Sequence, residues 1–286
     1  MLKKLIILLL FITSCNTIIP TEPNLKQENL MFTPLNESGT YEGYALGLGA
    51  TTAHNLQAPK IKSINGKVVM VSIGASVQNQ ISEIIDTRKT ELTNTKFRFV
   101  NLAQPSKDIN DWLTSTSVWN TVDSRLASAG ILASEVQIIW LQDDILDDVS
   151  PTFPDGPIIV KNALYSLIQV LKVEFPKVKH IFVTGRPYSG FTEDVKHDEP
   201  KGYYNGWSCR WLVEDQIRGI TPAKPWLTDV PYIWTDGTTP RLDGFSIVTS
   251  DYNVDGVHLS NAGKTKFGNY MFEQFKLNPV SSKYFY

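Results

Sequence analysis

Five short apolar runs, separated by longer segments, limit the architectures open to this chain. The runs are "KVVMVSI" (67–73), "KFRFVNL" (96–102), "VQIIWL" (136–141), "HIFVTG" (180–185) and "VPYIWT" (230–235). Short runs with so few polar residues are typical of strands buried on both faces, as in a parallel sheet. Two other segments have apolar residues at helical intervals: 158–175, between the third and fourth runs, and 261–276, after the fifth. We therefore predict an α/β fold, a three-layer α/β/α sandwich with a mostly parallel five-stranded sheet.

One connection, residues 186–229, is unusually long for such a fold. Its second part, from Cys209 to Ile217, has helical spacing. The first part has none, and we expect it to be a loop that covers the sheet edge or a functional site, since long ordered loops are often functional.

The first residues predict export. "MLKKLIILLLFITSC" has two lysines, a short apolar run and small residues before Cys15, which is a signal-peptide layout. The tail of this segment resembles a bacterial lipobox, so we predict a signal peptide over 1–14 and a lipid on Cys15. A lipid would hold the protein on a membrane surface of the bacterial envelope, which we expect to be the outer membrane. A plain signal peptide with a coincidental cysteine remains the alternative.

Further along, residues 15–35 are polar and Pro-containing, which predicts a flexible tether. Residues 36–66 are Gly-rich with few aliphatic residues, and we expect an irregular arm lying over a single domain at 67–286.

Composition argues against several kinds of partner. The net charge of −2 gives no reason to expect a nucleic acid or an anionic membrane as partner. His54, His180 and His197 are too scattered to predict a metal site. The Gly-rich segment "GLGATTAHN" follows no predicted strand, so it does not qualify as a phosphate-binding loop. We therefore expect no metal and no cofactor.

Two distant segments contain residues suited to nucleophilic catalysis. Ser76 directly follows the first predicted strand, where a strand-to-helix turn would present its hydroxyl at the sheet edge. Asp255 and His258 precede the last predicted helix, and this spacing lets the carboxylate orient the imidazole. Ser76 could instead be a helix N-cap, and His258 an incidental loop residue.

With these residues placed, the sequence resembles the SGNH/GDSL hydrolases. "VSIGAS" and "DGVHLSNAG" are similar to the first and last blocks of that superfamily, while "VNLAQPSKDINDW" (100–112) and "IIWLQDDI" (138–145) occupy the places of the second and third. The resemblance spans roughly residues 64–276. It implies the α/β/α fold, a Ser76–His258–Asp255 triad, and hydrolysis of an acylated small molecule or glycan, often a carbohydrate O-acetyl group.

The middle blocks depart from the family pattern. The second block's oxyanion-binding glycine is matched by Ser106, and the third block's asparagine falls on Gln142, Asp143 and Asp144. The resemblance thus implies backbone donors at Ser76 and Ser106, with help from Gln142 or Asp144. An ionised Asp cannot donate a hydrogen bond. A non-catalytic glycan-binding surface lipoprotein on the same scaffold is therefore the alternative function.

Aromatic residues in the long connection suggest a substrate surface. Tyr203, Tyr204 and Trp207 are the best candidates for stacking on a sugar ring, although packing in the core is the commoner role of such residues.

Arg186 follows the fourth predicted strand and could bind an anionic substrate group. It could equally pair with Glu214 or Asp215.

Overall fold

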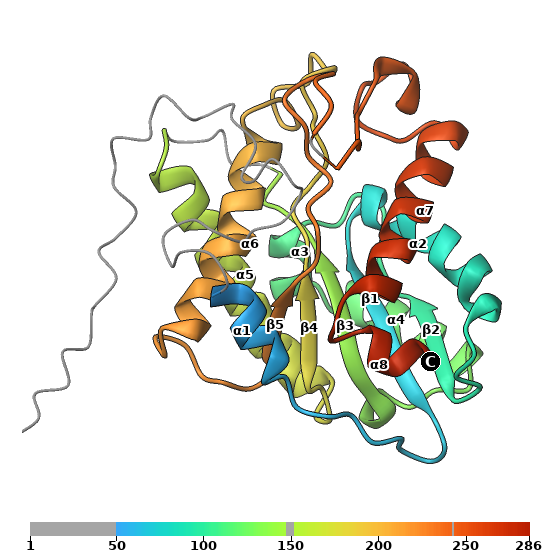
Figure 1. The fold of residues 1–286 in the computed structure, drawn as a ribbon. Coiled ribbons are helices and arrows are strands. Elements are labelled where there is room, and N and C mark those ends of the chain that lie inside the picture. The colour runs from blue at the N-terminus through green and yellow to red at the C-terminus, as the bar shows by residue number, and fades with distance from the viewer. Residues whose placement is uncertain (1–49, 147–151, 242) are drawn as a thin grey trace, which may run out of the picture.

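The computed structural model describes residues 50–146, 152–241 and 243–286, which fold around one parallel sheet (Figure 1). Its five strands lie in the order β2-β1-β3-β4-β5, and every neighbouring pair is parallel. The strands are β1 (Val68–Gly74), β2 (Phe97–Asn101), β3 (Val136–Gln142), β4 (His180–Val183) and β5 (Trp226–Asp229). This is the three-layer α/β/α fold that the apolar runs predict and that the resemblance implies.

Helices cover both faces of the sheet (Figure 1). One face carries α3 (Ile109–Thr114), α4 (Thr116–Ser128), α5 (Asp155–Glu174) and α6 (Lys201–Ile217), and the other carries α2 (Ser76–Arg88), α7 (Asn261–Leu277) and α8 (Ser282–Phe285). Short 3-10 turns span Lys89–Glu91, Ala133–Glu135 and Thr249–Asp251.

Strand β1, which has a neighbour on each side, shows why the runs lack polar residues. Val69, Val71 and Ile73 of β1 pack toward the α3–α6 layer, while Val68 and Met70 pack toward α2 and α7. Because successive side chains of a strand point to opposite faces, a strand covered on both sides must be apolar at nearly every position.

The fifth strand lies four residues earlier than predicted. Residues 226–229 pair with β4, and β4 itself ends at Val183, so 230–235 has no strand beside it. Pro231 also lacks the N–H that a sheet ladder requires. The run is apolar because Val230, Tyr232, Ile233 and Trp234 are buried. Burial alone, without strand pairing, explains its composition.

Part of the predicted irregular arm is helical. Residues Ala50–Leu56 form α1, which lies beside β5. The His54 ring stacks on Trp226 with centroids 4.2 Å apart, and its Nε2 lies 2.9 Å from the Leu227 carbonyl oxygen. The predicted signal peptide, Cys15, the tether and residues 36–49 lie outside the described residues. Within the described ranges, no helix is both long and apolar enough to cross a membrane.

Candidate active site

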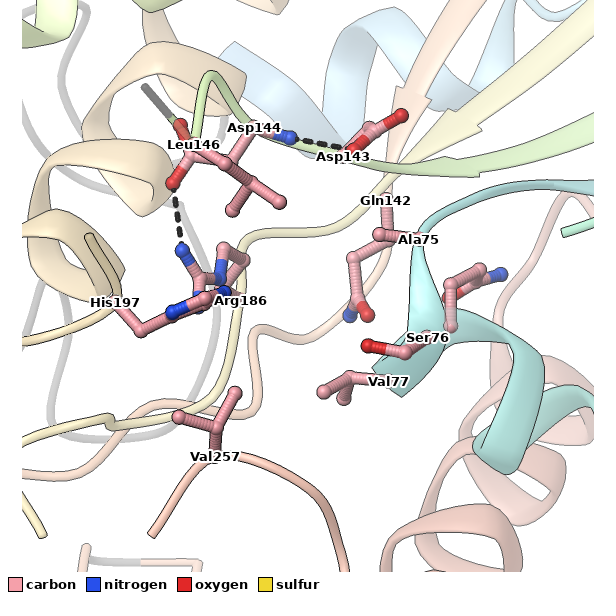
Figure 2. A pocket seen from close by; sticks show the side chains of 11 residues that line it. Ala75, Ser76, Val77, Gln142, Asp143, Asp144, Leu146, Arg186, His197 and Val257 are labelled. Atoms are coloured by element: carbon pink, nitrogen blue, oxygen red, sulfur yellow. Dashed lines mark hydrogen bonds and ion pairs between the residues drawn. The ribbon is translucent and has the colours of Figure 1, made fainter. Parts of the chain in front are cut away.

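A cleft opens where the chain order reverses in the sheet. From β1 the chain goes first to β2 on one side and later to β3 on the other, and ligands of open α/β sheets bind at such a point, beyond the carboxyl ends of the strands. The cleft has an empty volume of about 360 Å³, part of it open to solvent. Figure 2 shows its lining, which consists of Ala75, Ser76, Val77, Gln78, Gln142, Asp143, Asp144, Leu146, Arg186, His197 and Val257.

Ser76 stands at the start of α2, directly after β1. The helix N-cap is Ala75, so Ser76 is the first helical residue, and its hydroxyl has no hydrogen-bond partner in the described part of the chain. A Cβ at Gly74 would collide with the carbonyl oxygen of Gln142, so only glycine lets the two strand ends approach this closely. Ser76 lines the cleft. Because Ala75 is the N-cap, the alternative that Ser76 caps the helix does not apply.

Asp255 and His258 form the pair that their spacing predicts. Nδ1 of His258 lies 2.8 Å from Asp255 Oδ2, while Asp255 Oδ1 accepts the backbone N–H groups of Val257 and His258, both at 2.9 Å. Burial acts to raise the Asp255 pKa, but these hydrogen bonds outweigh it and hold the pKa below its ordinary value. An ionised carboxylate therefore fixes the ring, and Nε2 of His258 is left for another partner.

Gln80 connects the His258 loop to the helix that carries Ser76. Its Nε2 donates to the Leu259 carbonyl at 2.9 Å, and its Oε1 accepts the Leu259 N–H at 3.0 Å. Ser76 and Gln80 are four residues apart and so share one face of α2. The residue next to His258 is thereby held one helical turn from Ser76, and the two distant segments meet at one end of the sheet.

Backbone and amide donors surround the Ser76 hydroxyl. The first N–H groups of a helix have no intrahelical acceptor, so those of Ser76 and Val77 are available at the cleft. The Gln142 side chain donates to the Gly185 carbonyl at 3.2 Å, which leaves its second amide hydrogen. Figure 2 shows the Gln142 amide and the Ser76 hydroxyl pointing toward one another.

The position of Ser106 fits the second-block glycine in one respect. Its φ is 60°, the left-handed region that favours glycine. It does not line the cleft, and its N–H as an oxyanion donor stays a prediction.

Gln78 adds an unexpected polar side chain to the cleft. It is 1% exposed, lines the cleft, and neither its amide nitrogen nor its oxygen has a partner in the described ranges. A buried amide without partners is costly, so a ligand that supplied them would be favoured.

The two aspartates after β3 line the cleft and hydrogen-bond to neighbouring residues, although Asp143 Oδ2 has no partner among the described residues. Asp144 Oδ2 lies 3.0 Å from Arg186 Nη1, and Asp143 Oδ1 accepts the Asp144 N–H at 2.8 Å. Asn205 joins the two strand ends, since its Oδ1 accepts the Arg186 N–H at 2.9 Å and its Nδ2 donates to the Asp143 carbonyl at 2.7 Å. Burial raises the pKa of both carboxyl groups, even though Arg186 opposes it. Arg186 thus pairs with Asp144, not with Glu214 or Asp215 as the sequence allowed.

A second aspartate–histidine pair, which the sequence interpretation missed, reaches the cleft through its histidine, His197. Nδ1 of His197 lies 2.9 Å from Asp194 Oδ2, with the same three-residue spacing as Asp255 and His258. Figure 2 shows His197 beside Arg186, across the cleft from Ser76. The signal was present in the sequence as "DVKH" (194–197), but nothing in the surrounding residues indicated that it faced the site.

The loops that carry the two pairs pack against each other. A Cβ at Gly256 would collide with the Phe191 carbonyl and lie 2.6 Å from the Thr192 nitrogen. The Tyr252 hydroxyl donates to the Tyr188 carbonyl at 2.5 Å, and the rings of Phe191 and Tyr252 lie 5.5 Å apart. These contacts hold the two loops side by side, so that His197 of one loop and Val257 of the other line the cleft, while His258 is adjacent to Val257 and is not part of the lining.

The aromatic residues predicted to stack on a sugar lie in the core. Helix α6 begins at Lys201, eight residues earlier than its periodicity indicates, and this places Tyr203, Tyr204 and Trp207 inside the helix. Their side chains are 2%, 3% and 2% exposed and pack with Phe153 and Trp234. Faces covered in this way cannot stack on a ligand, so the prediction of a substrate role for them was wrong. In the described part of the chain, no group of three or more His, Cys, Asp and Glu side chains is arranged to hold a metal ion.

Comparison with known proteins finds likeness in three-dimensional structure only. No protein-family model matches the chain, and no curated protein matches its sequence. Three solved structures to which it is similar are a proposed acylhydrolase from Bacteroides fragilis, an acetyl xylan esterase, and a GDSL-like lipase from Bacteroides thetaiotaomicron. In that order, the identities are 10%, 14% and 11%, and the TM-scores are 0.46, 0.42 and 0.44. The alignments cover 78%, 72% and 78% of this chain and 91%, 98% and 93% of those chains.

Proposed function

We propose that this chain is a serine ester hydrolase that acts on an acyl ester, and that its substrate is an O-acetylated carbohydrate. The strongest support is the unpartnered Ser76 hydroxyl in the cleft at the sheet's switch point, with the His258 loop bonded to the same helix face through Gln80. The resemblance of the first and last sequence blocks to SGNH hydrolases supports it independently of this geometry.

The proposed reaction assigns one role to each of Ser76, His258 and Asp255. The Ser76 oxygen attacks the acyl carbon while His258 Nε2 takes the hydroxyl proton, and Asp255 stabilises the resulting imidazolium. The intermediate then collapses, the bond to the alcohol breaks, and His258 returns the proton to the leaving oxygen. Water, activated by the same imidazole, releases the acid from Ser76 in the same manner.

Stabilisation of the oxyanion rests on donors different from those of the family pattern. The N–H groups of Ser76 and Val77 lie at the positive end of α2, and the free amide hydrogen of Gln142 adds a side-chain donor. Gln142 thus takes the place of the missing third-block asparagine, while Asp144 is engaged with Arg186. Removal of one such donor typically costs about 10²–10³ in rate.

The decisive experiment replaces the nucleophile. Ser76→Ala should lower kcat/KM for p-nitrophenyl acetate by about 10³-fold or more, because it removes the proposed nucleophile. Ser124→Ala, an exposed serine on α4, is the matched control and should retain full activity. Unaltered melting temperatures show that both variants fold. Equal turnover by Ser76→Ala and the wild type would exclude the mechanism.

We further propose that the enzyme is exported and lipid-anchored through Cys15. The support is the sequence of residues 1–15. A labelled fatty acid fed to cells should be incorporated into the wild type and not into Cys15→Ala. Equal labelling of both would contradict this anchor.

A further inference from the structure

The Asp194–His197 pair takes no part in the chemistry proposed above, although it reaches the same cleft. We infer that His197 and Arg186 form a subsite for a hydroxyl group on the alcohol half of the substrate, with His197 accepting and Arg186 donating a hydrogen bond. The substrate class is then an ester of a polyhydroxy alcohol, such as a partly acetylated sugar. This inference rests on the proposed esterase function.

His197 is arranged to accept a hydrogen bond. Asp194 Oδ2 engages Nδ1 at 2.9 Å, while its Oδ1 accepts the Lys196 N–H at 3.0 Å. A carboxylate can only accept, so the neutral ring carries its proton on Nδ1 and presents a lone pair at Nε2. Burial lowers the pKa of His197, Arg186 and His258 lower it further, and Asp194 opposes them. The ring is therefore neutral near pH 7, and Nε2 has no partner in the described residues.

Arg186 is arranged to donate. Among the described residues its guanidinium makes one hydrogen-bonded contact, Nη1 to Asp144 Oδ2 at 3.0 Å. Its backbone N–H is fixed by Asn205, so the side chain leaves β4 from a defined point. The remaining guanidinium N–H groups have no acceptor in the part of the chain that the structure describes. Because Arg186 lines the cleft beside His197, these donors face the same space as the His197 lone pair.

A donor beside an acceptor distinguishes a hydroxyl from an anion. A hydroxyl oxygen accepts from Arg186 while its hydrogen is donated to His197, so both protein groups are satisfied. A carboxylate would accept from Arg186 but would meet the His197 lone pair without a hydrogen to offer. Arg186 is moreover already partnered by the carboxyl group of Asp144. The anionic substrate group that the sequence left open for Arg186 is thus a poorer fit than a neutral sugar hydroxyl.

The kinetic test compares two esters with the same acyl group. p-Nitrophenyl acetate has no alcohol-side hydroxyl, whereas a mono-O-acetylated methyl glucoside has several. His197→Ala should lower kcat/KM for the glucoside ester by about tenfold, the effect of losing one hydrogen bond, and should change p-nitrophenyl acetate turnover by less than about threefold. His197→Gln, whose side-chain oxygen restores an acceptor, should recover part of the loss.

Two kinetic outcomes would overturn the subsite. Equal loss on both esters would place His197 in the chemical step or in folding, and no loss on either would remove it from recognition. Should the wild type cleave neither ester, or should Ser76→Ala retain activity, the proposed function fails by itself.

A binding measurement tests the subsite without catalysis. In Ser76→Ala protein, methyl glucoside should shift the ring NMR signals of His197, which are identified by their absence in the double variant with His197→Gln. The fully acetylated glucoside, which lacks hydroxyl groups, should leave these signals in place. Identical shifts with both sugars, or no shift with methyl glucoside, would contradict hydroxyl recognition.

Discussion

Two loops of this protein carry the same aspartate–histidine pair, and their surroundings differ. In both, Nδ1 of the histidine lies against Oδ2 of an aspartate three residues earlier, at 2.9 Å for Asp194–His197 and 2.8 Å for Asp255–His258. The His258 side chain is 44% exposed and the His197 side chain is 22% exposed. The spacing therefore builds an oriented imidazole in each case, but it does not decide what that imidazole serves.

The two loops differ in the part of the protein that lies next to each histidine. The residue after His258 is bonded twice to Gln80 on the helix of Ser76, which suits a base for the nucleophile. His197 lies beside Arg186, which suits a contact to the part of the substrate that leaves. The function of each histidine thus depends on its neighbour, the Ser76 helix or Arg186, as much as on the aspartate that orients the ring.

Replacement of each aspartate in turn by asparagine gives the largest expected contrast between the loops. Asp255→Asn should lower kcat for p-nitrophenyl acetate by about 10²-fold or more, because the amide no longer fixes the His258 tautomer or stabilises its charge. Asp194→Asn should change the same rate by less than about threefold, since the ester lacks the hydroxyl that His197 would bind. Steady-state kinetics of both variants checks the contrast. Comparable losses would show that the loops are not specialised as proposed.

Removal of the connection to α2 gives a smaller effect. Gln80→Ala deletes two hydrogen bonds to Leu259, so we expect the free energy of unfolding to fall by about 1–2 kcal/mol and the rate by about tenfold. Gln169→Ala is the control and should alter neither value, because the hydrogen bonds of this side chain within the described ranges join it to Tyr165 and Lys172 of the same helix. Denaturant titration and kinetics give the two values. A fully active Gln80→Ala enzyme would mean that another contact positions His258.

The smallest effect concerns the charge state of His197. Burial lowers its pKa, so in the folded protein it takes a proton less readily than in the unfolded chain, whose histidines titrate near about 6.5. The free energy of unfolding therefore falls as the pH decreases through that value. Asp194→Asn removes a group that raises the pKa and should lower it further, which an NMR titration of the ring measures. An upward shift would contradict the assigned contact.

The sheet could be predicted from the sequence because its strands leave a local signal. Strands β1, β3 and β4 are buried at every position and mostly apolar, the edge strand β2 has one exposed residue, Arg98, and each predicted run overlaps its strand. Residues 230–235 have the same composition for a different reason, since they are buried beyond the last partner of β4. An apolar composition indicates that a segment is buried. Whether the segment also pairs as a strand depends on where the neighbouring strand ends.

Residue order in the sequence points to the segments of Ser76 and His258, which the structure brings together through Gln80, whereas features that depend on tertiary contacts alone were missed. Ser76 and His258 are marked by their places after the first strand and before the last helix. His197 has an equal motif, but its contact with Arg186 depends on how a long loop folds back over the sheet. Trp207 was misassigned for a related reason. The helical spacing in the sequence is recognisable only from Cys209, whereas the helix begins at Lys201 and buries Trp207.

The most direct test of the central claim is covalent labelling by a fluorophosphonate, with the modified residue located by mass spectrometry. The account predicts one adduct, on Ser76, that forms rapidly in the wild type and in His197→Ala. The adduct should be absent from Ser76→Ala and slowed by at least about 10²-fold in His258→Ala, since the base that activates the hydroxyl is gone. No adduct in the wild type, or an adduct on Ser76 whose rate depends on His197 and not on His258, would contradict it.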